Sequence, residues 1–205
     1  MPIQRPLLES IRLENGALQN LDQHRARMAS SLTFLGLPHE IAWSNSWTPI
    51  PISFQQGLWK FRLLYANDDF EVQIEPYCIR PVKSLQLVLA DHIDYPVKYA
   101  DRQAIQALFQ NRTYGDGILL VKNGLLTDTS YANVALFDGK KWVTPTLPLL
   151  AGTRRAGLIK AGKIFPKNIP ATALSNYQKI QLFNAMMDFG EGPVIDVENI
   201  GPFGR

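Results

Sequence analysis

Short segments in which apolar and polar residues alternate recur along the whole chain, and they predict more strand than helix. The first, Leu8–Leu13, is followed by Asn15-Gly16, a dipeptide that favours the tight turn of a β-hairpin. The remaining strands are predicted at residues 58–66, 70–79, 85–90, 117–122, 125–127, 132–137, 142–144, 180–183 and 194–197. We expect the strands between residues 117 and 144 to form one sheet.

Three longer segments carry apolar residues at helical spacing instead. The first runs from Asp22, which can cap it, to about Gly36. The others are predicted at Tyr99–Gln110 and Thr153–Ala161, and a short helix is expected near His39–Trp43. Strands and helices in this order predict an α+β fold.

The connection between two lobes is predicted at about residues 80–97. Pro81 and Pro96 require extended chain there, because proline disfavours helix in the residue that precedes it. We therefore expect an N-terminal α+β lobe at residues 1–90 and a C-terminal lobe at residues 91–205.

Composition excludes several classes of protein. The 205 residues are 46% hydrophobic and 19% charged, with a formal net charge of +3, which is typical of a soluble globular protein that binds anions. The basic residues are scattered, so nucleic acid is not an expected partner. The N-terminus lacks the apolar core of a signal peptide and no apolar run is long enough to span a membrane, so we expect a cytoplasmic protein.

Metal and disulfide chemistry is not expected either. Cys78 is the only cysteine in the sequence, so no disulfide can form within the chain. His24, His39 and His92 are dispersed without a neighbouring cluster of ligands, so no metal site is predicted.

The segment at residues 117–155 carries the most informative chemistry. Two apolar runs flank an acidic turn that contains Asp128, and Asn133 lies five residues later. A buried carboxylate there can keep a pyridinium nitrogen protonated. An ordinary turn aspartate that binds its own backbone has the same sequence.

Gly152, Thr153 and Arg154 open the third predicted helix. Free N–H groups and a hydroxyl at a helix start suit a phosphate dianion. Thr153 as an ordinary helix N-cap is the alternative interpretation.

Two basic residues complete the candidate site. Lys98 lies between extended chain and a predicted helix, where a side chain can be held firmly for covalent chemistry. Arg27 lies within the first helix and can bind an anion through several donors, whereas Arg25 faces another direction. For each of these residues a solvated side chain is the alternative. Together with Asp128 and Gly152-Thr153, Lys98 suggests an enzyme that uses pyridoxal phosphate (PLP).

Five segments, in the right order and covering most of the chain, resemble the class IV aminotransferase family, the fold-type IV PLP enzymes. LLESIRLENGALQNLDQHRARM is similar to the family's opening strand, hairpin and phosphate-arginine helix, with Arg27 at the arginine of H-x-x-R. VKYADR resembles the segment of the cofactor-linked lysine, and LLTDTSYANVALF resembles T-E-x-x-x-x-N. LLAGTRRAGLI is similar to the L-x-G-x-x-R phosphate loop, and QLFNAMM to the final loop beside the cofactor.

The resemblance implies a two-lobe α+β fold like that of D-amino acid aminotransferase, with a cofactor cleft between the lobes. It implies that Lys98 is the catalytic residue and is linked to PLP, and that the substrate is a small-molecule amine. It implies a homodimer. The cofactor-binding residues it implies are Arg27, Lys98, Asp128, Gly152, Thr153, Arg154, Asn184 and Ala185.

Three departures from the family pattern qualify the resemblance. The family has glutamate where this chain has the shorter Asp128. The usual strand pair before the first motif does not precede Glu9, and Leu8 replaces an aromatic residue of many transaminases.

Within the family, the spacing of Lys98 and Arg102 resembles the K-x-x-x-R of 4-amino-4-deoxychorismate lyase, an enzyme of folate biosynthesis that releases pyruvate and p-aminobenzoate. A branched-chain or D-amino acid transaminase is the alternative. A second alternative is a relative that binds PLP but has lost catalytic activity, because Asp128 replaces the family's glutamate.

Overall fold

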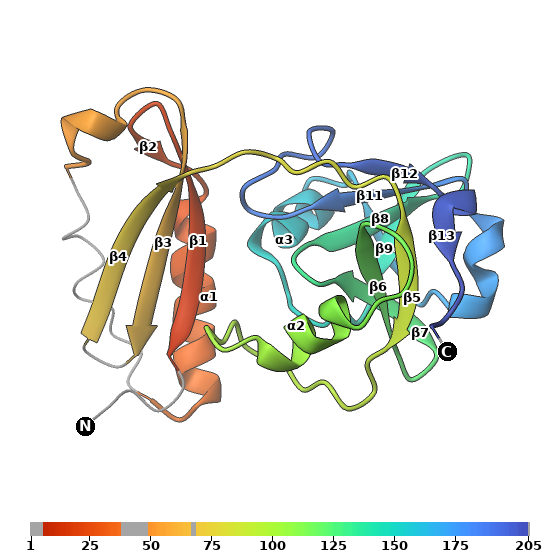
Figure 1. The fold of residues 1–205 in the computed structure, drawn as a ribbon. Coiled ribbons are helices and arrows are strands. Elements are labelled where there is room, and N and C mark those ends of the chain that lie inside the picture. Colours follow the sequence, from red (N-terminus) through yellow and green to blue (C-terminus); the bar gives the residue numbers. More distant parts are fainter. Residues whose placement is uncertain (1–5, 38–48, 67–68, 205) are drawn as a thin grey trace. The chain divides into compact units, whose positions relative to one another are not determined.

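The computed structural model describes residues 6–37, 49–66 and 69–204, and the chain forms two compact units. The first contains the chain up to Cys78 together with Val97–Asp101, and the second contains Ile79–Pro96 and Arg102–Arg205. Figure 1 shows the order of the elements along the chain in each unit. The helix expected near residues 39–43 lies outside the described residues.

The described residues of the N-terminal unit form an antiparallel sheet with strand order β2-β1-β3-β4, and the helix α1 packs against it. Its elements are β1 (Leu7–Glu14), β2 (Ala17–Leu18), α1 (Leu21–Phe34), the 3-10 turn η2 (Ile52–Phe54), β3 (Leu58–Ala66) and β4 (Asp69–Pro76). The predicted hairpin is confirmed, since Asn15 and Gly16 both have positive φ between β1 and β2.

The core of this unit follows from the two periodicities. Alternate residues of a strand face the same side, so Ile11 and Leu13 lie on the side of the β1 strand that faces α1. Met28 and Leu32 are one helical turn apart and are completely buried against these residues. Burial of each such side chain contributes roughly 1.5–3 kcal/mol.

The C-terminal unit has two sheets, with strand orders β13-β5-β6-β7 and β10-β9-β8-β11-β12. Its first elements are β5 (Leu85–Leu89), α2 (Gln103–Gln110), β6 (Gly117–Lys122), β7 (Leu125–Thr129), β8 (Asn133–Phe137) and β9 (Trp142–Pro145). They are followed by α3 (Thr153–Lys160), β10 (Phe165–Lys167), η3 (Ala171–Asn176), β11 (Lys179–Phe183), β12 (Val194–Asp196), η4 (Val197–Asn199) and β13 (Ile200–Gly201). Ala135, Leu158, Ile164 and Phe183 form a core under α3.

The strands between residues 117 and 144 do not form one sheet as expected. β6 and β7 belong to the first sheet of the unit, whereas β8 and β9 belong to the second. The chain therefore passes from one sheet to the other between Thr129 and Asn133. This crossing brings residues at the end of β7 beside those at the start of β8.

The division into units also differs from the boundary expected at residue 90. β5 belongs to the C-terminal unit because it pairs in parallel with β6. The segment Val97–Asp101 belongs to the N-terminal unit because the Leu8 N–H donates to the Lys98 carbonyl, 2.8 Å away.

The same pairing shortens the predicted second helix. The N–H groups of Tyr99 and Ala100 donate to Val97 and Pro6, so α2 begins only at Gln103. Strands β10 and β13 were not predicted, since both are very short. None of the helices in the described part of the chain is long and apolar enough to cross a membrane.

Candidate functional site

The N-terminal unit contains a buried carboxylate at Glu9, held by two residues of α1. Glu9 points to the same side of β1 as Ile11, into the core. His24 and Arg27 are three residues apart and so share one face of α1. His24 Nδ1 lies 2.6 Å from Glu9 Oε2, and Arg27 Nε donates to Glu9 Oε1 at 2.8 Å while Arg27 Nη2 donates to Oε2.

These contacts fix the charges of the cluster. Burial raises the pKa of Glu9, but the charge of Arg27 and the hydrogen bonds from His24 and Arg27 outweigh it and hold the pKa at about 2. Burial lowers the pKa of His24, so the imidazole is neutral near pH 7 and Nδ1 carries the proton donated to Glu9. The cluster thus holds Arg27 in one orientation.

Lys98 lies in the segment that returns to this unit. Its carbonyl accepts from Leu8, the residue next to Glu9, and its side chain is half-buried. The positive charge of Lys98 is one of the causes that lower the pKa of His24. The structure therefore brings Lys98 and Arg27, both predicted from the sequence, into the same part of one unit.

A second buried carboxylate, Asp128, lies at the sheet crossing of the C-terminal unit. It does not bind its own turn, because Thr129 Oγ1 accepts from the Ala132 N–H at 3.0 Å instead. Asp128 Oδ1 accepts from Asn133 Nδ2 and Asp128 Oδ2 accepts from the Leu150 N–H, both at 2.8 Å. The turn interpretation of Asp128 is therefore wrong.

The donors around Asp128 are mostly neutral, and this determines its protonation. Burial raises the pKa of Asp128 to about 6, although Asn133, the Leu150 backbone and the charge of Arg155 each act to lower it. Asp128 is thus a carboxyl group that can share a proton near neutral pH.

Asn133 joins Asp128 to the loop before α3. Its Nδ2 also donates to the Leu150 carbonyl at 2.9 Å. A Cβ atom added to Gly152 would lie 1.9 Å from Asn133 Oδ1, so the loop backbone can approach Asn133 only because residue 152 has no side chain.

The start of α3 has the donors of an anion site. Gly152, not Thr153, is the N-cap residue, and no side chain caps the helix. Thr153 Oγ1 is buried and has no hydrogen-bond partner among the described residues. The first N–H groups of a helix have no acceptor within it, so together with this hydroxyl they fit a phosphate group. The N-cap interpretation of Thr153 is therefore wrong.

The two arginines after Thr153 have different surroundings. Arg154 is partly buried, and its Nη2 pairs with Oδ1 of the half-exposed Asp188 at 2.6 Å. Arg155 is buried, its Nη2 donates to the Pro145 carbonyl at 2.7 Å, and its charge acts on Asp128. Of the two, Arg155 is the one beside the acid.

The turn between β7 and β8 is held from two more segments. Arg102 Nη2 donates to the Ser130 carbonyl, and Asn184 Nδ2 donates to the Tyr131 carbonyl at 3.3 Å. Asn184 reaches this turn because the end of β11 lies beside Asn133. Asn184 and the following Ala185 thus lie near the sheet crossing.

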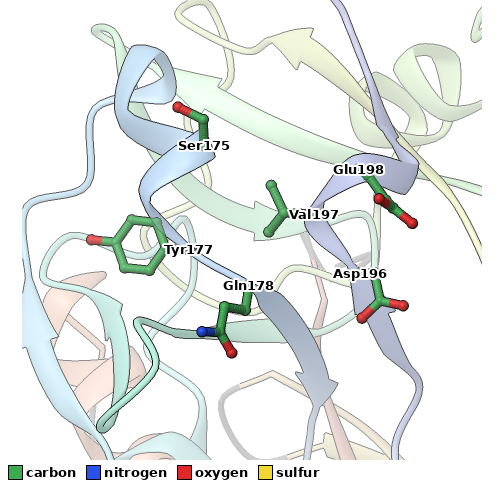
Figure 2. Close-up of a pocket in the computed structure, with 6 residues that line it drawn as sticks. All are labelled: Ser175, Tyr177, Gln178, Asp196, Val197 and Glu198. Atoms are coloured by element: carbon green, nitrogen blue, oxygen red, sulfur yellow. The ribbon is translucent and has the colours of Figure 1, made fainter.

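A shallow pocket of about 460 Å³ lies elsewhere in the C-terminal unit (Figure 2). Two segments line it, Ser175–Gln178 and Asp196–Glu198, and neither contains a predicted site residue. Asp196 and Glu198 do not belong to any group of three or more potential metal ligands among the described residues. The candidate functional residues are therefore those that the hydrogen bonds of Glu9 and Asp128 connect, and not those that line this pocket.

Sequence reasoning missed Glu9, His24 and Arg155 as site residues. Counting L-x-G-x-x-R from Leu150 places its arginine at Arg155, so the motif spacing could have identified it. His24 is the histidine of the H-x-x-R motif, but its role appears only in the structure, and Glu9 gave no sequence signal, since an ion pair between a strand and a helix forms only when they pack.

Comparison with known proteins supports the resemblance noted in the sequence. Residues 96–191 match the family model described as amino-transferase class IV. An uncharacterized protein of Haemophilus influenzae is 36% identical over 183 residues, which cover 88% of this chain and 97% of that protein.

Solved structures show the same fold. A candidate 4-amino-4-deoxychorismate lyase from Haemophilus somnus is 31% identical, with a TM-score of 0.83 over 91% of this chain and 98% of that one. A candidate amino-acid aminotransferase from Mesorhizobium loti has 20% identity and a TM-score of 0.73 over 96% of this chain and 99% of that one. A hypothetical aminotransferase from Mycobacterium tuberculosis in a PLP-bound form has 15% identity and a TM-score of 0.76 over 96% and 81%.

The buried Glu9 ion pair generates a prediction about stability. Glu9→Gln removes the buried carboxylate charge that faces the Arg27 guanidinium, so we expect the unfolding free energy near pH 7 to fall by about 3–5 kcal/mol. The folded-state pKa of Glu9 is depressed from 4.5 to about 2, so the advantage of the wild type is complete above pH 4.5 and is lost as the pH falls toward 2. Urea unfolding of both proteins from neutral pH to about pH 3 measures this. If the difference in unfolding free energy between wild type and Glu9→Gln did not change with pH, it would contradict the lowered pKa of Glu9.

The close approach of Gly152 to Asn133 generates a second prediction. Gly152→Ala places a methyl group against the Asn133 amide, so we expect a loss of about 1–3 kcal/mol in unfolding free energy. Gly157→Ala is the matched control in the same helix, since a Cβ there meets nothing within 4 Å and alanine gains about 0.5–1 kcal/mol. Urea unfolding compares the two variants. Equal effects of both substitutions would show that the loop does not need this contact.

Proposed function

Since this chain belongs to the class IV aminotransferase family, whose members depend on PLP, we propose that it is a PLP-dependent 4-amino-4-deoxychorismate lyase. The observation that carries the cofactor assignment is the start of α3, where the buried Thr153 hydroxyl has no hydrogen-bond partner among the described residues and lies three residues after Leu150, whose N–H binds Asp128. A phosphate group satisfies that hydroxyl and the first N–H groups of the helix.

The residues of both units have separate roles in the proposal. Lys98 would hold the cofactor covalently, and Arg27, Gly152, Thr153, Asn184 and Ala185 would bind its phosphate end. Arg27 is suited to this because the Glu9 carboxylate fixes the plane of its guanidinium group. Asp128 would hold the proton at the ring nitrogen, and the charge of Arg155 would act on that carboxylate. We do not assign the phosphate to Arg154, since it pairs with Asp188.

When bound, PLP supplies a ring that takes up electrons from the bond that breaks in the substrate. Lys98 Nζ would take the proton that the substrate loses, because an amine that has been released from the cofactor is a base beside the bond that breaks. Burial of Asp128 excludes water from the carboxylate and strengthens its interaction with the ring. The products would be pyruvate and p-aminobenzoate.

The lyase is preferred over a transaminase for two reasons. The similarity to the candidate lyase from H. somnus extends over 98% of that protein. Arg102 follows Lys98 at the spacing of the lyase branch and holds the turn that joins Asp128 to Asn133. We further propose, by family resemblance, a cytoplasmic homodimer.

Covalent binding is tested by spectroscopy. Protein supplemented with PLP should show the visible absorption band of the protein-bound cofactor, and borohydride reduction followed by peptide mapping should label Lys98. The band and label should be absent from Lys98→Ala and present in Lys163→Ala, which alters an exposed lysine of the same chain. A wild-type protein without the band would overturn the PLP assignment.

The reaction is tested by product analysis. With 4-amino-4-deoxychorismate we expect pyruvate and p-aminobenzoate in equal amounts, with no activity in Lys98→Ala. Glutamate formed from 2-oxoglutarate and an amino acid, without p-aminobenzoate, would identify a transaminase instead. A bound cofactor without turnover of either kind would favour a PLP carrier.

A further inference from the structure

The carboxylate of Asp128 is already engaged with the loop that precedes α3. Its two oxygens accept one hydrogen bond each, from the Asn133 amide and from the Leu150 N–H. The Leu150 N–H lies in the backbone only three residues before Thr153. Asp128 therefore acts on the loop directly through hydrogen bonds.

Asn133 completes this link from a second strand. Its Nδ2 bridges Asp128 Oδ1 and the Leu150 carbonyl, so both backbone groups of Leu150 are held. Its Oδ1 occupies the space where a side chain at residue 152 would begin. Asn133 is buried and is fixed by the β8–β11 pairing, in which it lies opposite Phe183. The loop is thus clamped immediately before the helix start.

The clamp determines where Thr153 points. A buried hydroxyl without a partner costs roughly 1–3 kcal/mol, so the fold would relax it if the loop were free to move. The hydrogen bonds of Leu150 and the tight contact at Gly152 oppose that relaxation. The unpartnered hydroxyl is therefore maintained by the clamp.

The length of the aspartate side chain agrees with this role. An added methylene would move the carboxylate by about 1.5 Å, which is large compared with a hydrogen bond. Both contacts of Asp128 are 2.8 Å long, so a longer side chain in the same backbone position would have to give up one of them or bend away. Aspartate fits the loop contacts where a longer acid does not.

We propose that Asp128 and Asn133 are positioning residues that clamp the loop at residues 149–153, so that the Thr153 hydroxyl and the first turn of α3 bind the phosphate of the cofactor. This inference rests on the proposed PLP function and adds a role for two residues in phosphate binding. Asn133 carries the role without any contact to the cofactor, which makes it the residue to test.

The test compares two ligands that differ only in the phosphate. Binding of PLP and of pyridoxal to wild type, Asn133→Ala and Asn133→Ser is measured by absorbance titration. We expect both variants to lose PLP affinity by about tenfold or more and to lose less pyridoxal affinity, since the loss of an oriented hydrogen-bond set for a charged group is of that size. Asn199→Ala, at an exposed asparagine of the same unit, should bind both ligands like the wild type.

Hydrogen exchange of the protein without cofactor gives an independent measurement. The amide of Leu150 should exchange faster in Asn133→Ala than in the wild type, whereas amides in the β1–β3 pairing should be unchanged. Gly152→Ala disturbs the same contact from the other side and should show the same selective loss of PLP affinity.

The outcomes separate the two proposals. Equal loss of PLP and pyridoxal affinity in the Asn133 variants, or unchanged exchange at Leu150, would overturn the clamp and leave the PLP assignment intact. A wild-type protein that binds neither ligand would overturn the proposed function itself. Selective loss of PLP affinity with faster exchange at Leu150 supports the clamp.

Discussion

A buried carboxylate is stable only if hydrogen-bond donors replace the water it loses, and the donors of Asp128 hold three segments of the C-terminal unit together. The chain supplies the donors from a neighbouring strand, through Asn133, and from a loop twenty-two residues away, through the Leu150 N–H. Each donor is a group whose position then becomes fixed. The end of β7, the start of β8 and the start of α3 are therefore held together by one buried acid.

The N-terminal unit also buries a carboxylate, that of Glu9, but its pKa is lowered and not raised. Glu9 is as deeply buried as Asp128, but its donors include the charged guanidinium of Arg27, so its pKa falls to about 2 and it is ionised near neutral pH. The donors of Asp128 are mainly neutral amides, so burial raises the pKa of Asp128 to about 6. One acid serves to orient a cation, and the other is left able to share a proton. Two carboxylates of similar burial thus acquire different chemistry from the charge of their neighbours.

This contrast bears on the proposed function. In the proposed site, the cation would be Arg27, which Glu9 orients, and the N–H groups would be those at the start of α3, which follows the loop bound by Asp128. The replacement of the family's glutamate by Asp128 does not remove the carboxylate from the site, since burial and hydrogen bonding keep it at the sheet crossing. Both oxygens of the shorter Asp128 side chain accept hydrogen bonds, one from Asn133 and one from the Leu150 N–H of the loop.

Local sequence determined the elements and the order of the motifs. The strand β3 and the helices α1 and α3 follow from alternation and helical spacing, because these patterns record which face of an element is buried. The strand β6 follows instead from a short apolar run, which is typical of a strand that is buried on both faces. The order of Arg27, Lys98, Asp128 and Gly152-Thr153 identified the family, because each motif is a local piece of chain with a fixed spacing.

Only the tertiary structure decided which residues meet. The sheet crossing between Thr129 and Asn133, the return of Lys98 to β1 and the shortened α2 depend on backbone pairing between segments far apart in the chain. The choice of Arg155 over Arg154 beside the acid, and the ion pair of Glu9 with Arg27, likewise arise from packing. A sequence pattern states how much of a side chain is buried, but the partner of a buried polar group is set by whichever donor the fold brings within hydrogen-bond distance.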